Sequence, residues 1–146
     1  MHMTTHHNVA TLVAYDCWAL LEGADIARVA WQGPEELALV PVNYSVDGGS
    51  LWFRTEPGTA LARQCDGAAL VAEVDRVEPD GQGAWSVVVR GTAELVDADD
   101  VPDTLMEMRV WPVNPHSKFV RLRPDTVTGR RIWSARPTEG ASDARP

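Results

Sequence analysis

The segment 40–61 constrains the fold of this chain more than any other stretch of its sequence. Two apolar runs, 40–46 and 50–55, flank Asp47-Gly48-Gly49, and a glycine-bearing turn of this kind between apolar runs predicts a β-hairpin. Pro57 follows the second run and suits the first turn of a short helix. The segment therefore predicts a hairpin whose second strand bends into a helix.

The bend in this segment gathers chemical groups that bind phosphate. Arg54 offers a guanidinium fork, Thr55 and Thr59 offer hydroxyls, and Gly58 permits close approach of the backbone. Backbone N–H groups at the start of a helix also attract anions. The alternative is that Arg54 and Thr55 are ordinary strand residues facing solvent, which sheets commonly contain. We predict that this corner holds the phosphate of a cofactor.

Turn residues separate the other apolar runs at regular intervals. Val13, Cys17 and Leu21 fall at helical spacing, which predicts a helix over residues 10–22 that ends at Gly23. The predicted strands cover residues 26–31, 37–46, 50–55, 68–74, 84–96, 118–127 and 131–134, and the predicted short helices cover residues 57–64 and 100–109. About six antiparallel strands with only short helices are typical of a small barrel, so the predicted fold class is mainly β.

The composition suits a single globular domain. The chain has 146 residues, of which 45% are hydrophobic and 23% are charged. We expect a flexible lead at residues 1–9, a folded domain at residues 10–136 and a disordered tail at residues 137–146. No apolar run approaches the ~20 residues of a membrane span, and the first residues lack the pattern of a signal peptide. The expected location is the cytoplasm.

The charge of the chain is strongly negative and unevenly distributed. A formal net charge of −8 argues against nucleic acid as a partner. Residues 116–136 nevertheless contain six basic side chains and a single acid, Asp125. This basic segment is either a solvated strand pair that balances acidic neighbours or an edge that faces an anion. The sequence alone does not decide between these interpretations.

The chain lacks the motifs that mark common catalytic sites. It has no GxSxG nucleophile elbow, no Walker A loop and no HExxH zinc motif. Cys17 and Cys65 lack the spacing of metal ligands or of a CxxC pair, so we expect reduced thiols and no metal site. The sequence identifies no catalytic residue, and any chemistry has to come largely from a bound cofactor.

Two further segments are candidates for contacts to a planar cofactor. Pro41 removes a donor from its strand, which would leave backbone groups near Val42 and Asn43 free to meet a heterocycle. Ser86 points opposite to Trp85 and could bond a ring carbonyl. The alternatives are a plain edge strand for the first segment and a core-packing Trp85 for the second.

Several segments, in order and spacing, resemble the pyridoxamine 5′-phosphate oxidase-like, FMN-binding split-barrel family. The likeness is greatest to its compact bacterial branch, which includes nitroimidazole-resistance-type proteins. The segments are Cys17–Leu21 with Ala27–Ala30, Val40–Tyr44 with Asp47–Gly49, Leu51–Thr55 with Pro57–Thr59, Trp85–Gly91, and, more weakly, Val120–Pro124 with Thr128–Ile132. The resemblance extends over residues 12–134.

The resemblance implies a split β-barrel homodimer that binds FMN in clefts at the subunit interface. The implied cofactor-binding residues are Arg54, Thr55 and Thr59 at the phosphate, Pro41, Val42 and Asn43 along the isoalloxazine ring, and Ser86 at the polar edge of the ring. The implied activity is that of an FMN-dependent oxidoreductase acting on a small organic substrate.

One position departs from the family pattern. Many members carry a lysine where this chain has Ala60, and the loss of that ammonium removes a charge-assisted hydrogen bond worth roughly 1.5–3 kcal/mol. The alternatives are weak flavin binding, an F420-dependent reductase, a non-catalytic flavin- or haem-binding protein, or a barrel without a ligand. The acidic tail of F420 would need a basic groove. The residues that could form it are Arg121, Arg123, Arg130 and Arg131.

Overall fold

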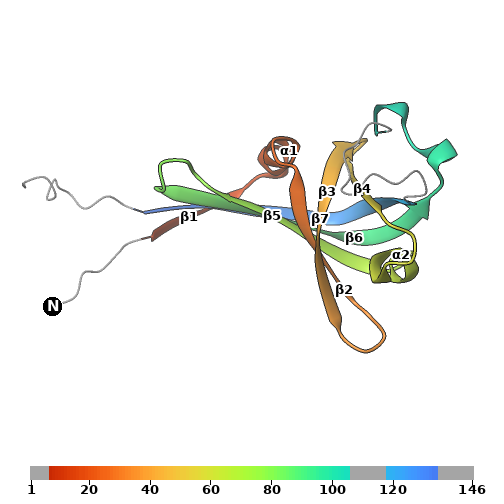
Figure 1. Cartoon of the computed structure of the whole chain (residues 1–146). Helices are drawn as coiled ribbons and strands as arrows, with labels where there is room; N and C mark the ends of the chain where they lie inside the picture. Colours follow the sequence, from red (N-terminus) through yellow and green to blue (C-terminus); the bar gives the residue numbers. More distant parts are fainter. Residues whose placement is uncertain (1–6, 106–117, 135–146) are drawn as a thin grey trace, which may run out of the picture.

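The structure is a computed structural model that describes residues 7–105 and 118–134 (Figure 1). Its strands are β1 (His7–Leu12), β2 (Ile26–Gln32), β3 (Leu37–Asp47), β4 (Ser50–Thr55), β5 (Ala69–Val77), β6 (Gly83–Val96) and β7 (Lys118–Ser134). Its helices are α1 (Ala14–Glu22) and α2 (Ala60–Gln64), and two 3₁₀ turns lie at Ala98–Asp100 and Asp103–Leu105. The described chain is mainly β with short helices, as predicted.

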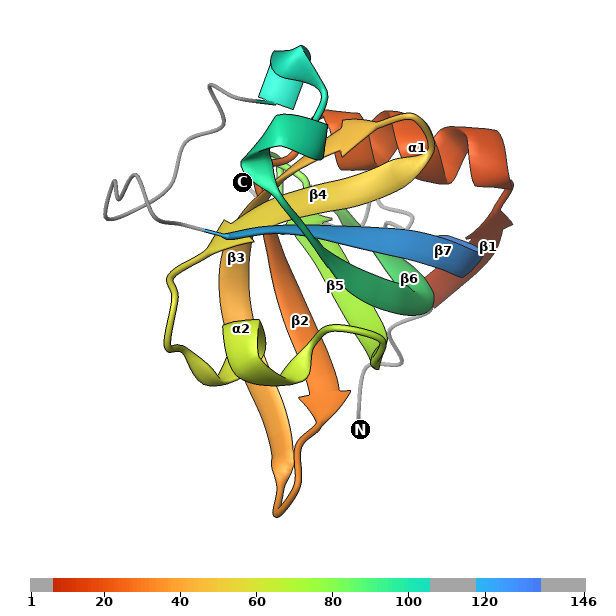
Figure 2. The same ribbon diagram turned by 90° about the vertical axis from the view of Figure 1, so that its right-hand side faces the viewer.

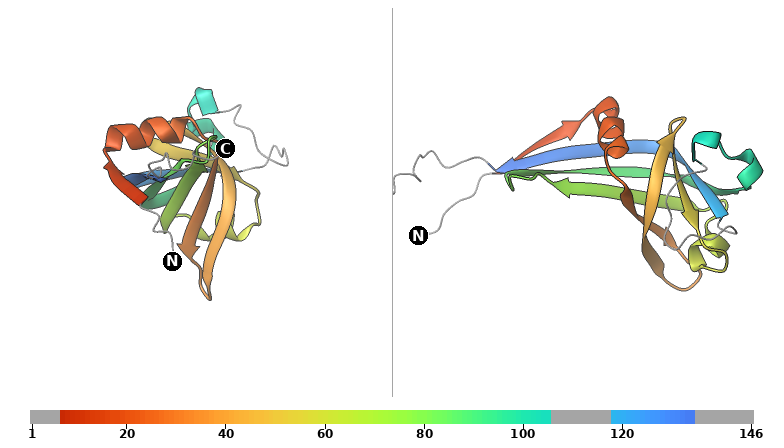
Figure 3. Two further views of the ribbon diagram at one scale, coloured as in Figure 1. Left: turned by 90° about the vertical axis from the view of Figure 1, so that its left-hand side faces the viewer. Right: turned by 45° about the horizontal axis from the view of Figure 1, so that its top comes forward.

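The strands form one antiparallel sheet that closes on itself. Its order is β1-β7-β4-β3-β2-β5-β6, and β6 also pairs with β7, which joins β2 to β7 into a six-stranded barrel. The first part of β7 pairs with β4 and its last part pairs with β1. Figure 3 shows β5, β6 and β7 running past α1, away from the end of the barrel that carries α2. The predicted split barrel of about six antiparallel strands is confirmed.

Strand β6 approaches β7 unusually closely at Gly91. The register between the two strands shifts between Arg90 and Gly91. A Cβ at Gly91 would lie 1.8 Å from the carbonyl oxygen of Arg123, so only glycine fits this position. The core-facing side of β6 alternates with its more exposed side. Its buried residues are Trp85, Val87, Val89, Gly91 and Ala93.

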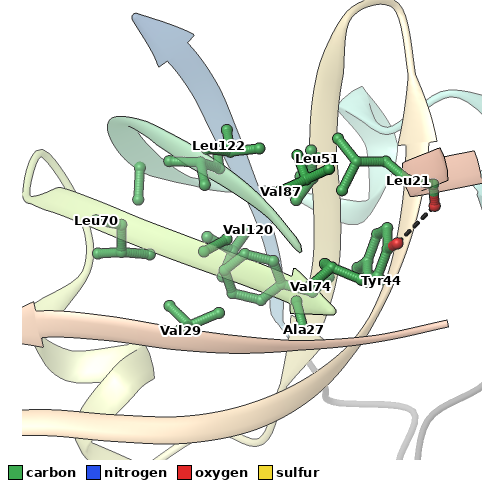
Figure 4. Close-up of a cluster of buried hydrophobic side chains, with 14 of the residues drawn as sticks. Leu21, Ala27, Val29, Tyr44, Leu51, Leu70, Val74, Val87, Val120 and Leu122 are labelled. Atoms are coloured by element: carbon green, nitrogen blue, oxygen red, sulfur yellow. Dashed lines mark hydrogen bonds between the residues drawn. The ribbon is translucent and has the colours of Figure 1, made fainter. Parts of the chain in front are cut away.

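The main core fills the barrel, and α1 packs against it (Figure 4). Cys17 and Leu21 of α1 are fully buried in this core. The hydroxyl of Tyr44 on β3 donates a hydrogen bond to the carbonyl oxygen of Leu21 over 2.5 Å. This bond ties the last turn of α1 to the barrel wall.

A second apolar cluster lies on the outer side of the wall formed by β4 and β7. Trp52 and Phe119 on these strands pack with Val101 and Leu105 from the segment that holds the two 3₁₀ turns. Figure 2 shows this segment beside the ends of β4 and β6. Because Phe119 is paired with Arg54 across the strands, the cluster forms a packed base next to that arginine.

Four predicted boundaries are wrong. The helix predicted for residues 57–64 begins at Ala60, with Thr59 as its N-cap, so Pro57 lies in the turn before it and not in its first turn. The helix predicted for residues 10–22 begins at Ala14, because residues 7–12 pair with the end of β7 and form β1. Residues 7–9 of the predicted flexible lead therefore belong to a strand, and residues 1–6 lie outside the described residues. The two predicted closing strands are one strand, since the chain stays extended through Gly129.

The helix predicted for residues 100–109 is only partly described. Its described residues lie in the two 3₁₀ turns and the bend between them, not in an α-helix. Residues 106–109 and the tail predicted for residues 137–146 lie outside the described residues. Within the described part of the chain, no helix is long and apolar enough to cross a lipid bilayer.

Candidate functional site

Six of the seven residues predicted to bind a cofactor line one cleft of about 270 Å³. The cleft lies where β3 and β4 separate, and the first turn of α2 closes its third side. Its lining residues are Val40, Pro41, Val42, Asn43, Arg54, Thr55, Glu56, Thr59, Ala60 and Leu61. The predicted phosphate corner is thus a real concave feature of the surface, and only Ser86 lies elsewhere.

Packing between β4 and β7 positions the side chain of Arg54. The guanidinium carbon lies 4.9 Å from the centre of the Phe119 ring, on the neighbouring residue of β7. A cation over an aromatic face at this distance is attracted by the ring quadrupole. Phe119 is itself buried in the outer cluster, so its ring is a fixed surface for the arginine. The cation at the cleft is therefore held in place before any ligand arrives.

The two predicted threonines form a hydrogen-bonded pair in the lining of the cleft. The hydroxyl oxygens of Thr55 and Thr59 are 2.9 Å apart. Thr59 donates its proton to the carbonyl oxygen of Glu56 and accepts a bond from the amide of Ala62, which caps α2. In this arrangement Thr55 donates to Thr59. A phosphate would therefore take its hydroxyl bond from Thr55, whose proton can turn away from Thr59.

Strand β3 offers backbone groups to the cleft on one edge. The amide of Tyr44 donates to Asp25 on the β2 side. Because backbone direction alternates along a strand, Val42 also directs its amide to β2, while Pro41 and Asn43 face the other way. β3 pairs with β4 only from Tyr44 onward, so the backbone of Pro41 and Asn43 faces the cleft.

This arrangement corrects the predicted role of Pro41. Pro41 lies opposite Arg28 in register, at a position where its missing N–H would have pointed into the cleft. It therefore interrupts no bond to β2. The open edge exists because β4 ends at Thr55 and the chain turns away, not because the proline breaks the ladder. Val42 also lines the cleft, and its side chain packs against the main core.

Ser86 does not reach this cleft. It lies on β6, and β2 and β5 separate that strand from β3 in the sheet. Its cross-strand neighbours are Asp75 and Arg130. The alternation along the strand correctly places Ser86 on the face opposite Trp85. It does not predict the order of the strands in the sheet, which depends on pairings between distant segments.

Two residues near the cleft were not predicted. Glu56 lines it, so the lining carries one acidic side chain beside Arg54. Arg63 on α2 donates from Nη1 to the carbonyl oxygen of Gly58, in the turn that forms one wall. A sequence signal existed for Arg63, because it follows Ala60 by three residues on a helix and shares its face.

The basic segment of β7 is largely balanced by carboxylates. Arg123 contacts Glu94 at 3.0 Å, and Arg121 lies 3.7 Å from the same carboxylate. Arg131 contacts Glu78 at 3.0 Å. Three of the four arginines considered for an F420 groove thus have acidic partners, which favours the interpretation as a charge-balanced strand.

The described residues hold no cluster of three or more metal-ligating side chains. Cys17 and Cys65 are both fully buried free thiols. Burial, with a smaller effect of Asp66, raises the pKa of Cys65 to about 11, and burial also raises the pKa of Cys17. Neither thiol has the exposure or the low pKa of a reactive nucleophile.

A larger cleft, of about 540 Å³, lies at the tip of the β5–β6 hairpin. It includes Glu78, Arg131 and Trp133 but none of the predicted cofactor-binding residues. An ion pair between Glu78, just after β5, and Arg131 on β7 already crosses this larger cleft. The smaller cleft is therefore the candidate site, because the side chains predicted to bind phosphate converge there.

The cleft fits a phosphate group and part of a nucleotide. Sites for drug-sized ligands usually measure roughly 300–1,000 Å³, and this cleft is smaller than that range. The guanidinium, the hydroxyl of Thr55 and the open edge of β3 are donors and acceptors of the right kind for a phosphate and a heterocycle. One chain therefore offers room and polar groups for a phosphate and part of a heterocycle.

The sequence model of the family described as pyridoxamine 5′-phosphate oxidase matches residues 14–131, most of the chain. The chain belongs to the pyridoxamine 5′-phosphate oxidase family. The match spans every residue that lines the cleft, so the corner is part of the shared family domain. No curated protein sequence matches the chain significantly.

Solved structures agree with this family assignment. A proposed pyridoxamine 5′-phosphate oxidase from Corynebacterium glutamicum is 28% identical, with a TM-score of 0.73 over 88% of this chain and 96% of that chain. An FAD binding protein from Mycobacterium smegmatis is 28% identical, with a TM-score of 0.71 over 90% and 99% of the two chains. A proposed 5-nitroimidazole antibiotic resistance protein from Bacteroides thetaiotaomicron shares the fold, with 14% identity, a TM-score of 0.64 and coverage of 93% and 98%.

Proposed function

We propose that this protein binds a flavin nucleotide, with a phosphate of the cofactor in the corner formed by Arg54 and Thr55. The observation that carries the proposal is the convergence of six predicted residues on one cleft, around a guanidinium already stacked on Phe119. Two of the residues, Pro41 and Asn43, would face the ring with backbone groups. The match to the pyridoxamine 5′-phosphate oxidase family and the likeness to an FAD binding protein support this choice of ligand.

When bound, a flavin supplies hydride-transfer chemistry that no side chain can perform. The residues of this chain would bind and orient the cofactor. Arg54 and Thr55 would fix the phosphate, and the backbone of Asn43 would pair with the polar edge of a ring lying along β3. The proposed activity is that of an oxidoreductase for a small organic substrate in the cytoplasm, and the sequence assigns no acid or base to it.

We further propose that a homodimer completes the site, for which two features of the surface give support. The cleft of one chain, at about 270 Å³, is smaller than the roughly 300–1,000 Å³ that sites for drug-sized ligands usually measure. Next to it, the outer face of β2 and β3 exposes large apolar side chains: Ile26 is 59%, Leu37 is 77% and Leu39 is 65% exposed. Exposed apolar side chains beside an incomplete site favour a second copy of the chain as their cover.

The identity of the flavin is a choice between three cofactors. FMN is the cofactor predicted from the sequence, and FAD is the ligand named for the relative from Mycobacterium smegmatis. F420 is the third candidate, but it has less support because carboxylates balance most of the basic groove it would use. A non-catalytic flavin-binding protein is the alternative to an oxidoreductase.

The test of the proposed function starts with the purified protein. We expect the protein to carry a yellow cofactor or to bind one when titrated with FMN, FAD or F420 and followed by fluorescence. Arg54→Ala should weaken flavin binding about tenfold or more, because it removes a charge-assisted contact. The matched control is Arg123→Ala, which changes an arginine paired with Glu94 outside the cleft and should leave binding unchanged.

Three results bear on this proposal. Equal flavin affinity of Arg54→Ala and the wild-type protein would refute the phosphate corner. A monomeric flavin-bound protein in analytical ultracentrifugation would refute the shared site. Reduction of bound flavin by reduced nicotinamide, followed by oxidation with a nitroaromatic or quinone, would support an oxidoreductase, and no turnover with any acceptor would favour the non-catalytic alternative.

A further inference from the structure

The larger cleft lies at the tip of the β5–β6 hairpin, which Figure 3 shows at the end of the sheet away from α2. Its volume of about 540 Å³ falls within the roughly 300–1,000 Å³ that sites for small molecules usually measure. It shares no lining residue with the candidate cofactor site. The two clefts are therefore separate features of the chain, and the larger one needs a ligand of its own.

Gly83 forms the floor of this cleft between two walls. It lies opposite Trp133 of β7 in register, and on its other side its carbonyl oxygen accepts a hydrogen bond from the amide of Glu78. Because glycine has no side chain, the space between Glu78 and Trp133 stays open. A Cβ at position 83 would lie 3.4 Å from the Cβ of Trp133 and 3.6 Å from the Cγ of Glu78. Any larger residue would therefore narrow the cleft from both sides.

Trp133 gives one wall of the cleft an aromatic surface. This residue is 39% exposed, and it lines the cleft across from the turn that follows β5. The missing side chain at Gly83 leaves the indole uncovered on the side of β6. An uncovered indole buries apolar groups, and its face attracts a cation more strongly than the rings of Phe or Tyr do.

The lining of the larger cleft carries a net negative charge. Its charged side chains are those of Glu78, Asp80 and Arg131. Glu78 and Arg131 form an ion pair at 3.0 Å, so their charges cancel formally. Asp80 accepts a hydrogen bond from the amide of Gln82 through one carboxylate oxygen, and no residue in the described part of the chain forms an ion pair with it. The carboxylate of Asp80 therefore leaves the cleft with a formal charge of −1.

We propose that the larger cleft binds a small organic cation, with its ammonium group facing Asp80 and its apolar part lying on Trp133. An anion is disfavoured there, because it would meet a carboxylate that no cation of the lining balances. Arg76 does not change this balance within the cleft, since it lies opposite Trp85, nearer to the barrel, and is not a lining residue. The proposal involves no residue of the candidate cofactor site.

Three ligands of similar size test the charge and the apolar contact separately. Phenethylammonium is a cation, phenylethanol is neutral and phenylacetate is an anion. Each is titrated into the full-length protein, and the indole N–H signals of the tryptophans are followed by NMR. The signal of Trp133 is identified by its absence from the spectrum of Trp133→Phe. We expect this signal to move, with phenethylammonium binding about three- to tenfold more tightly than phenylethanol and phenylacetate binding most weakly.

Two variants separate the carboxylate from the indole. Asp80→Asn removes the charge but keeps an oxygen that can accept the bond from Gln82, so it should weaken phenethylammonium binding about two- to fivefold and leave phenylethanol binding unchanged. The matched control is Asp125→Asn, which changes an exposed acid of β7 outside the cleft. Trp133→Ala removes the apolar wall and should weaken the binding of both ligands.

Three results would overturn the proposal. Equal affinity of the wild type for phenethylammonium and phenylethanol would show that charge does not select the ligand. Equal effects of Asp80→Asn and Asp125→Asn would show that Asp80 does not face the ammonium group. A Trp133 signal that stays in place with all three ligands at millimolar concentration would show that the cleft is not a binding site. A failure to bind flavin would contradict the proposed function alone, because no residue of the candidate site enters this test.

Discussion

The guanidinium of Arg54 lies 4.9 Å from the ring centre of Phe119, its cross-strand neighbour on β7. Phe119 belongs to the outer apolar cluster, whose residues do not line the cleft. The packing of this cluster therefore positions the guanidinium of Arg54, which does line the cleft. Arg121 makes a similar contact with Trp52 over 5.6 Å, two residues along the same strand pair. The outer apolar cluster thus positions a side chain of the candidate site.

Phe119→Leu tests this support. The substitution keeps an apolar side chain but removes the aromatic face, and a cation–π contact is worth about 0.5–1 kcal/mol. We expect flavin affinity to fall about two- to fivefold, measured by fluorescence titration. The control is Trp52→Phe, which disturbs the same cluster without touching Arg54. A similar loss of affinity in both variants would assign the effect to general packing.

The barrel could be predicted from the sequence because its signals are local. The hairpin of β3 and β4 follows from a glycine turn between apolar runs, and β6 follows from a long alternation of buried and exposed residues. The phosphate corner was predictable for the same reason. Arg54, Thr55 and Thr59 come from adjacent segments, so local geometry alone brings them together.

The errors concern contacts between distant segments. Strand β1 exists because it pairs with β7 at the other end of the chain, and nothing within residues 7–12 shows that partner. Gly129 looks like a turn residue, but a Cβ there would lie 2.7 Å from the sulfur of Cys17. The glycine therefore serves the close packing of α1 on β7. The bond from the side chain of Arg63 to the carbonyl oxygen of Gly58 also cannot be predicted from the sequence, because it depends on the three-dimensional path of the turn.

Gly91→Ala should destabilise the barrel severely. The added Cβ would meet the backbone of Arg123, which cannot move without separating β6 from β7. We expect a loss of at least about 3 kcal/mol or an insoluble protein, since overpacking against rigid backbone is among the costliest changes. Gly23→Ala is the control, because nearest atoms there are 3.7 Å away and φ is −91°. Urea unfolding that shows equal stability for both variants would contradict the close approach.

Thr59→Ala should weaken the start of α2. The hydroxyl caps the amide of Ala62 and bonds to Thr55, and loss of an N-cap side chain costs about 1 kcal/mol. Thr59→Ser keeps both bonds and should unfold at nearly the wild-type urea concentration. If serine and alanine variants are equally destabilised, the methyl group rather than the hydroxyl is what matters at this position.

Stability should decline between pH 9 and pH 11 because of Cys65. Burial raises the pKa of this thiol from 9.0 to about 11 in the folded protein. Folding therefore favours the neutral thiol. The contribution of this thiol to the free energy of unfolding is fully present below pH 9 and is lost as the pH rises through 11. Integrated over this window, the loss amounts to about 2 kcal/mol.

Urea unfolding under reducing conditions at pH 8 and pH 10.5 measures this decline. Cys65→Ala removes the titrating group and should show a smaller fall over the same interval, although its stability at pH 8 is lower. Tyr44 also has a raised pKa because of burial, from an ordinary value of 10.0, so part of the decline should persist in the Cys65→Ala variant. An identical pH dependence in both proteins would show that folding does not raise the pKa of Cys65.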